Sequence, residues 1–228
     1  MELNDLKRIT IVTGHFGSGK TEFCINFGKF LAAKNDRKIC LIDLDIINTY
    51  FRMRDQEEYL KTQGIQVIST AFKVTTLDIP ALDPAIEGSI IDTNKRVLID
   101  VGGNPSGARA LGRYAHVLDS EGYEQIYVVN ANRPETARVE QVIDFIEQTQ
   151  NQSQTKVGWL VNTTHMLKHT SVEDILKGEK LIREVSDKTG IPILCTAVLD
   201  HIVEDVKKAD STIKIFPIKL HFRDDWML

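Results

Sequence analysis

The stretch "ITIVTGHFGSGKTEF", residues 9–23, decides the fold. Five apolar or β-branched residues lead into the pattern G-x-x-x-x-G-K-T, from Gly14 to Thr21, and apolar residues at helical spacing follow. Glycines let a loop curl so that its N–H groups point inward at oxygen atoms, and a helix N-terminus adds partial positive charge. Lys20 supplies a full charge for the β- and γ-phosphates of a nucleotide, and Thr21 supplies a hydroxyl for Mg²⁺. The stretch therefore predicts a strand, a phosphate-binding loop and a helix.

The alternative to a phosphate loop is a glycine-rich turn that merely packs. At average residue frequencies the pattern arises in roughly one chain in a hundred of this length. The strand before it and the helix after it make a chance match rarer still. We therefore assign nucleotide binding to Gly14, His15, Phe16, Gly17, Ser18, Gly19, Lys20, Thr21 and Glu22.

The composition argues against several classes of protein. Of 228 residues, 42% are hydrophobic and 26% are charged, which is ordinary for a folded soluble chain. The net charge is −4 and the sequence pI is about 5.9, whereas nucleic-acid binders usually carry a basic stripe. Three cysteines lie far apart in apolar surroundings, as in reduced cytosolic proteins. No signal-peptide pattern and no run near the ~18 apolar residues of a membrane span is present. We expect a cytoplasmic protein that binds neither nucleic acid nor membrane.

Short apolar runs alternate with amphipathic stretches along the whole chain. Strands are expected at Ile9–Thr13, Ile39–Asp43, Ile65–Ser69, Val97–Val101, Ile126–Asn130, Val157–Val161 and Ile193–Ala197. Most are near-continuous Val/Ile/Leu runs, which is typical of strands buried on both faces of a parallel sheet. The alternation predicts one doubly wound α/β domain over residues 1–228, with a mostly parallel sheet, helices on both faces and a Rossmann-like three-layer arrangement. Its ligand crevice should lie at the carboxyl ends of the strands.

Helix signals occupy the stretches between the strands. Phe23 to Leu31 carry aromatic and apolar residues at helical spacing. Ser171 begins a weak capping pair, Gly190 is expected to end the helix that follows, and Gly178 favours an interruption within it. The Pro-interrupted segment 71–91 fits no core element well, and we expect substrate or partner contacts there.

Carboxylates stand at the ends of two buried strands. The stretch "KICLIDLDIINTYFR", 38–52, ends its strand in Asp43 and then Asp45, and "RVLIDVGG", 96–103, runs into Asp100. Such carboxylates are costly to bury unless a positive group lies nearby, and Mg²⁺ is the natural candidate beside a phosphate loop. The alternative is that Asp43 and Asp45 cap a loop or pair with nearby arginines, at positions 52 and 54.

These three stretches resemble the MinD/ParA-like P-loop ATPases of the CobQ/CobB/MinD/ParA nucleotide-binding domain, which include cobyrinate and dethiobiotin synthetases. The resemblance implies that Lys20 and Thr21 contact phosphate and Mg²⁺. It implies that Asp43 and Asp100 hold water ligands of the metal. It implies that Asp45 orients or activates the attacking water, which makes Lys20 and Asp45 the expected catalytic residues.

The resemblance also extends to the two ends of the nucleotide. Gly103, in the Gly-Gly turn after Asp100, is expected to contact the γ-phosphate and to move with it. Asn162, in "VGWLVNTTH", stands where such proteins often bind adenine. The guanine signature N-K-x-D is absent, so ATP is favoured over GTP. One position departs from the MinD pattern, because His15 replaces a lysine that reaches across a dimer, and this weakens the case for a nucleotide-dependent homodimer.

The expected function is Mg²⁺-dependent ATP binding. One hypothesis is a slow ATPase switch, in which nucleotide state shapes residues 45–54 and 102–109 and an unknown partner protein responds. A second is a small-molecule kinase or an ATP-dependent ligase, with an acceptor near Asp45, Asn48, Arg52 and the segment 71–91. A third is a nucleotide sensor without catalysis.

Overall fold

The computed structural model describes residues 5–34, 37–45, 56–69 and 84–221. Its centre is one eight-stranded sheet in the order β3-β2-β4-β1-β5-β6-β7-β8, and every pairing within it is parallel. The strands are β1 (Ile9–Gly14), β2 (Lys38–Leu44), β3 (Ile65–Ser69), β4 (Lys95–Val101), β5 (Tyr123–Val129), β6 (Trp159–Asn162), β7 (Ile193–Leu199) and β8 (Ile215–Ile218). The predicted fold class is confirmed.

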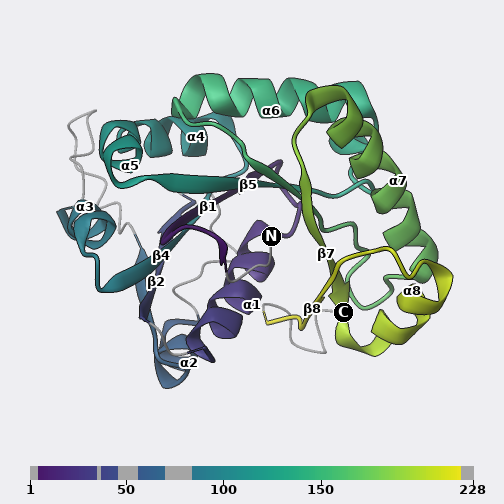
Figure 1. Ribbon diagram of the computed structural model, residues 1–228, viewed down its shortest axis with the longest axis horizontal. Helices are drawn as coiled ribbons and strands as arrows, with labels where there is room; N and C mark the ends of the chain where they lie inside the picture. Colours follow the sequence, from purple (N-terminus) through teal and green to yellow (C-terminus); the bar gives the residue numbers. More distant parts are fainter. Residues whose placement is uncertain (1–4, 35–36, 46–55, 70–83, 222–228) are drawn as a thin grey trace.

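Helices cover both faces of this sheet (Figure 1). They are α1 (Lys20–Ala32), α2 (Glu57–Thr62), α3 (Pro84–Ile91), α4 (Pro105–Gly112), α5 (Ala115–Glu121), α6 (Val139–Ser153), α7 (Val172–Thr189) and α8 (Val203–Ala209), with short 3-10 turns at Pro134–Thr136 and Asp200–Ile202. On one face, α1 packs Phe23 and Phe27 against apolar side chains such as Val12 and Leu41. On the other face, α3, α4 and α5 cover the neighbouring side chains of β1, β2 and β4, and α6 and α7 cover β5 and β6.

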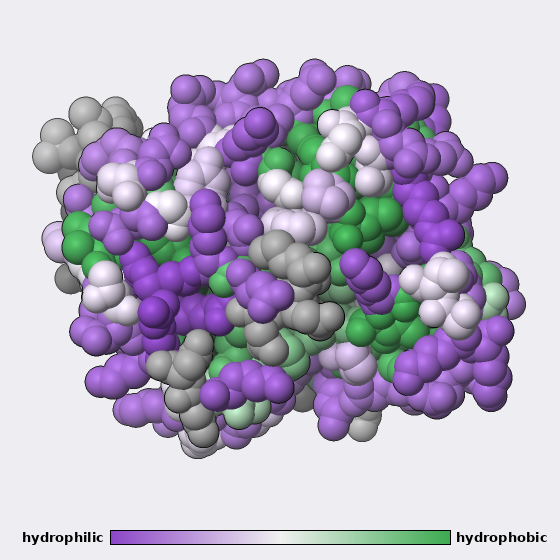
Figure 2. Space-filling view, in the orientation of Figure 1, coloured by the Kyte–Doolittle hydropathy of each residue, from purple (hydrophilic) through white to green (hydrophobic). Residues whose placement is uncertain are grey.

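The visible surface of the protein is mainly hydrophilic. On the face shown in Figure 2 most side chains are hydrophilic, and the hydrophobic ones gather between α7, β7 and β8. Among the helices of the described residues, none has both the length and the apolar character needed to cross a bilayer.

Strand register determines which chemical groups meet at the carboxyl edge of the sheet. β1 lies between β4 and β5, so the loop after β1 is flanked by the loops after both neighbours. Asp43 of β2 pairs in register with Asp100 of β4, and Val12 of β1 also lies beside Asp100. The two carboxylates and the glycine-rich loop therefore meet at one edge, as expected for a parallel sheet.

Several elements were not predicted from the sequence, among them β8 and α3. β8 carries Pro217, which lacks a backbone donor, and the strand lies at the edge of the sheet where this is tolerated. Within the segment 71–91, residues 84–91 form α3, whose Ile86 and Ile90 are buried in the core. The expectation that this part fits no core element was wrong, whereas residues 70–83 lie outside the described residues.

Gly178 does not interrupt its helix, which corrects the sequence expectation. α7 runs unbroken from Ser171, whose side chain accepts a hydrogen bond from the Asp174 N–H, to the left-handed Gly190 at its end. The glycine is needed for packing, because an added Cβ would collide with the side-chain oxygens of Asn162 and Thr164. Helix α7 can therefore approach the loop after β6 only where it has no side chain.

Replacing Gly178 by Ala should destabilise the fold by about 1–3 kcal/mol, because overpacking here outweighs the gain in helix propensity of roughly 1 kcal/mol. The matched control is Gly88→Ala in α3, where an added Cβ meets nothing within 4 Å and a small stabilisation is expected. Urea unfolding of both variants measures the difference. A Gly178→Ala protein as stable as the wild type would contradict this account of the α7 packing.

Candidate nucleotide-binding site

The loop between β1 and α1 curls back on itself. The Ser18 N–H donates to the His15 carbonyl oxygen at 3.2 Å, and Lys20 Nζ donates to the same oxygen at 3.1 Å. Gly17 and Gly19 have φ values of 73° and 82°, which residues with a side chain rarely adopt. No side chain caps α1, so the N–H groups of its first turn remain available to an anion.

The loops after β5 and β6 hold this loop in shape. Asn130 Nδ2 and Arg133 Nε both donate to the Gly17 carbonyl oxygen, at 3.3 and 3.0 Å. Thr163 Oγ1 donates to the Ser18 carbonyl oxygen at 2.6 Å. Sequence reasoning missed Asn130, Arg133 and Thr163. Their position was a usable signal, since each is a polar residue at the end of a predicted strand or within three residues after it, at the carboxyl edge of the sheet.

Asp100 is the most unusual carboxylate of the site. Its side chain is buried, and among the described residues neither oxygen has a hydrogen-bond partner of good geometry, with the Thr21 hydroxyl acting only as a weak donor. Burial, and secondly the Asp43 carboxylate, raise the pKa of Asp100 to about 7, while Lys20 and Thr21 act in the opposite direction. Two buried acceptors with so little donation are expensive unless a cation or its water ligands occupy the space in front of them. The geometry of Asp100 therefore fits a magnesium site.

Asp43 and Asp45 complete the acidic edge. Asp43 is buried, and its Oδ1 accepts a hydrogen bond from the Asp45 N–H at 2.9 Å. No group of three or more His, Cys, Asp or Glu within the described ranges could hold a metal by itself. This is compatible with Mg²⁺, which is usually bound through one or two carboxylates together with substrate phosphates and water.

Lys20 lies beneath the loop. Its side chain is buried, and this burial lowers the pKa of the ammonium group, while the Asp100 and Asp45 carboxylates counteract the shift. A buried ammonium with one carbonyl partner keeps donors for a further acceptor. Lys20 therefore has the burial and charge needed to bind phosphate oxygens.

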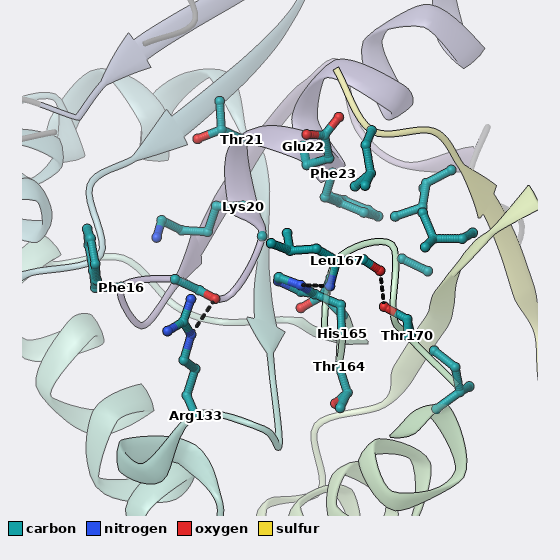
Figure 3. Close-up of a pocket in the computed structure, with 18 of the residues that line it drawn as sticks. Phe16, Lys20, Thr21, Glu22, Phe23, Arg133, Thr164, His165, Leu167 and Thr170 are labelled. Atoms are coloured by element: carbon teal, nitrogen blue, oxygen red, sulfur yellow. Dashed lines mark hydrogen bonds between the residues drawn. The ribbon is translucent and has the colours of Figure 1, made fainter. Parts of the chain in front are cut away.

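A cavity of ≈ 230 Å³ extends from this loop to the loop after β6 and to the strands β7 and β8 (Figure 3). Of the predicted site residues, it is lined by Phe16, Gly17, Gly19, Lys20, Thr21, Glu22 and Asp45. Further along it is lined by Thr163, Thr164, His165, Leu167, Thr170, Ile175, Ala197, Leu199, Ile218 and Leu220. One end of the cavity is thus formed by the glycine loop, and the rest is mainly aliphatic with several hydroxyl groups.

Four predicted residues face a second cavity, of ≈ 200 Å³, which Gly14, His15, Phe16 and Gly103 help to line. The His15 ring packs against Phe145 of α6, with ring centroids 4.5 Å apart. An added Cβ on Gly103 would lie 2.5 Å from the Phe16 nitrogen and 2.6 Å from Lys20 Nζ. The turn after β4 therefore packs directly on the glycine loop.

Ser18 lines neither of these two cavities, whereas Glu22 lines the first. Ser18 is buried, and its hydroxyl has no hydrogen-bond partner among the described residues. Glu22 reaches the cavity, but its carboxylate also bonds to His221 Nδ1 at 2.7 Å and to the His221 N–H at 2.6 Å.

Asn162 lies behind the cavity. Its side chain is fully buried, donates to the Ile175 carbonyl oxygen at 3.2 Å and accepts from the Thr164 N–H at 3.0 Å. Its visible role is to order the loop after β6, whose threonines reach the cavity. The adenine contact assigned to Asn162 stays a prediction. Arg52 and Arg54 lie outside the described residues.

A glycine loop at the carboxyl edge of a parallel sheet, with a buried lysine and an uncapped helix, defines a P-loop nucleotide-binding protein. The comparison with protein families agrees with this class. Residues 9–207 match the CbiA model, described as the CobQ/CobB/MinD/ParA nucleotide-binding domain, and the chain belongs to this family. No match was found among curated proteins.

Several solved structures share the fold. FtsY of Mycoplasma mycoides matches with a TM-score of 0.58 and 18% identity, over 87% of this chain and 63% of that chain. Chloroplast FtsY of Physcomitrella patens matches with a TM-score of 0.56 and 14% identity, over 82% and 57%. The signal recognition particle receptor FtsY of Elizabethkingia anophelis, in complex with GDP, matches with a TM-score of 0.54 and 18% identity, over 83% and 57%. The chain spans less than two thirds of each, and these likenesses show the fold alone.

Proposed function

We propose that this chain is a Mg²⁺-dependent ATP-binding protein that hydrolyses ATP slowly and whose nucleotide state is read by a partner protein in the cytoplasm. The observation that carries the proposal is Asp100, a buried carboxylate whose oxygens have no hydrogen-bond partner of good geometry, beside the Lys20 ammonium and a weakly donating Thr21 hydroxyl. Mg·ATP would bring a cation to Asp100 and phosphate oxygens to Lys20, and so relieve both buried charges.

The residues at the glycine loop take defined roles in this proposal. Thr21 would bind Mg²⁺ through its hydroxyl, and Asp43 and Asp100 would hold the water ligands of the metal. Magnesium supplies positive charge that neutralises the phosphate oxygens. Asp45, which lines the cavity, would accept a hydrogen bond from the attacking water and orient it toward the γ-phosphorus.

We infer a preference for adenine over guanine from the loop after β6. This loop contributes Thr163, Thr164, His165, Leu167 and Thr170 to the cavity, and none of these is a carboxylate, whereas Glu22 and Asp45 line the cavity at the glycine loop. Guanine has an N1–H and a 2-amino group side by side, and without an acceptor of this kind their burial is unfavourable. One structural neighbour binds GDP, but at 18% identity that likeness does not transfer a ligand.

Direct packing between two segments supports a switch. Gly103 lies against Phe16 and Lys20, and an added Cβ on Gly102 would lie 3.0 Å from Asp45 Oδ1. The same turn leads into α4, whose first turn is capped by Asn104 through the Gly107 N–H at 2.8 Å. A γ-phosphate beside Lys20 would therefore contact the residues that position α4, and its loss would change their bonding.

Two other functions use the same cavity. A kinase or an ATP-dependent ligase would need an acceptor beside Asp45, and it would stay idle until that acceptor is supplied, whereas a switch releases phosphate slowly without one. A sensor would bind nucleotide and release no phosphate. A nucleotide-dependent homodimer is compatible with each function, although His15 packs on its own chain. Membrane and nucleic acid are not among the partners that we propose.

The first test is Lys20→Ala. Removing a charge-assisted contact worth about 1.5–3 kcal/mol should weaken ATP binding roughly ten- to a hundredfold. Calorimetry with ATP and Mg²⁺ measures the change, and Lys29→Ala, which removes a lysine from the same helix away from the loop, is the control. Unchanged affinity in the Lys20 variant would remove the phosphate-binding assignment.

The second test concerns the base. ATP should displace a labelled ATP analogue at a concentration about tenfold lower than GTP, since one unpaired buried donor costs about 1–3 kcal/mol. A competition titration with ATP, GTP and ADP at constant Mg²⁺ measures this preference. The adenine assignment would have to be abandoned if GTP competed as well as ATP.

A further inference from the structure

Arg133 braces the glycine loop through Nε, but the positive charge of its guanidinium has no part in the proposed function above. Arg133 follows β5 and lines the first cavity together with Lys20 and Thr21. Its Nε donates to the Gly17 carbonyl oxygen at 3.0 Å. Figure 3 shows the guanidinium directed at the loop that carries Phe16 and Lys20. The residue is half-buried, so its charge is partly removed from water.

The loop after β5 fixes the position of this arginine. The Arg133 N–H donates to the Asn130 carbonyl oxygen at 3.2 Å, and Asn130 Nδ2 reaches the same Gly17 carbonyl as Arg133. Pro134 follows directly and starts a 3-10 turn. Arg133 is therefore fixed twice. Its backbone N–H is bonded to the Asn130 carbonyl oxygen, and its side-chain Nε is bonded to the Gly17 carbonyl oxygen.

Gly17 makes room for this arginine. An added Cβ at Gly17 would lie 2.6 Å from Arg133 Cζ, Nε and Nη2. Glycine is therefore required at position 17 for two reasons: the backbone has a positive φ there, and the guanidinium lies where a side chain would be.

The charge of Arg133 is not compensated by a carboxylate in the described part of the chain. Its hydrogen bond goes from Nε to a neutral carbonyl, and the terminal amino groups keep four N–H donors. The other side chains of the loop are small, aromatic or imidazole, so Lys20 is the loop's own permanent cation. A half-buried guanidinium without an acidic partner, beside a predicted phosphate site, is suited to bind an anion with two parallel hydrogen bonds.

We propose that Arg133 is a catalytic arginine supplied by the chain itself, which contacts the phosphate oxygens of the bound nucleotide and stabilises the charge that develops during hydrolysis. This inference rests on the proposed ATPase function. The water oxygen bonds to the γ-phosphorus, the bond from the γ-phosphorus to the bridging oxygen breaks, and that oxygen keeps the electron pair. The water proton passes to Asp45 and then to solvent. Arg133 donates hydrogen bonds to the oxygens that gain negative charge and exchanges no proton.

A purely structural role is the alternative, in which Arg133 only braces Gly17. The two roles differ in what they predict. A brace affects ATP and ADP binding equally and lowers the melting temperature. A group that acts in the transition state lowers kcat and leaves the affinity for ADP nearly unchanged.

The experiment compares wild type, Arg133→Ala and Arg133→Lys in the full chain, with Arg138→Ala as the control. Arg138 is an exposed arginine of the same connection and does not line the first cavity. Phosphate release at saturating Mg·ATP gives kcat, calorimetry gives the affinities for Mg·ATP and Mg·ADP, and fluorescent ADP with aluminium fluoride reports binding of a transition-state analogue.

We expect Arg133→Ala to lower kcat and the affinity for the fluoride complex by about 100-fold, with ADP affinity within about threefold of wild type. Arg133→Lys should retain part of the rate, and added guanidinium ions should restore part of it in Arg133→Ala but not in the control. Equal loss of ATP and ADP binding, no effect on kcat, or a wild type that binds ATP without turnover would each overturn the proposal. If wild type fails to bind Mg·ATP, the proposed function itself fails, which is a separate result.

Discussion

Replacing Asp45 by Asn is expected to lower the kcat of ATP hydrolysis by about 100- to 10,000-fold, while the affinity for Mg·ATP changes little. Asp45 lines the cavity at the glycine loop, and its backbone N–H is bonded to Asp43. Asparagine keeps the size of the side chain and loses the negative charge that holds the attacking water in the transition state. A fall in kcat without a fall in affinity is the expected signature of this role.

Phosphate release at saturating Mg·ATP, together with calorimetry, measures this pair of effects. Asp187→Asn is the matched control, because it makes the same chemical change at an exposed position of α7. Equal rates for wild type and Asp45→Asn would end the water-positioning role. That result would instead favour an enzyme that requires an acceptor, or a nucleotide sensor without catalysis.

Replacing Asp100 by Asn should have two effects of opposite sign. Without nucleotide or metal, the ionised carboxylate is buried with only weak donation from Thr21, so its removal should stabilise the fold by about 1–3 kcal/mol at pH 8. Lys20 loses the attraction of that carboxylate, which reduces the gain. Mg·ATP binding should weaken about 10- to 100-fold, because the metal loses an anionic partner. A more stable protein that binds its ligand worse would identify a functional carboxylate.

The pH dependence gives a second check on Asp100. The folded carboxyl has a pKa raised to about 7, whereas an unfolded aspartate titrates near about 4. Between these values the folded state binds the extra proton, so its stability falls as pH rises through this window. The variant should lack this component, so the stability difference should shrink to roughly a third of its pH 8 value at pH 5 and vanish only below about pH 4. Urea unfolding from pH 5 to 8 in the presence of a chelator measures it, and a difference that does not change with pH would contradict this assignment.

Much of the fold could be predicted because its signals are local. The strands of a parallel sheet are apolar runs, and β1 to β7 all overlap the predicted stretches. β8 was missed because it is short and contains Pro217. Gly178 was misread because a glycine inside a helix looks like a break, and only the contact with Asn162 and Thr164 shows why it is required.

The sequence by itself determined the phosphate end of the candidate site. The order of Gly14 to Thr21 and the carboxylates at two strand ends are sufficient, because parallel strands bring their carboxyl ends to one edge. Only the tertiary structure decided what surrounds that end. It placed His15 against Phe145 and buried Asn162 behind the cavity. It also set Arg133 on Gly17, 116 positions away in the chain. No pattern in the sequence reports such a contact, because it depends on the order of β1 and β5 in the sheet.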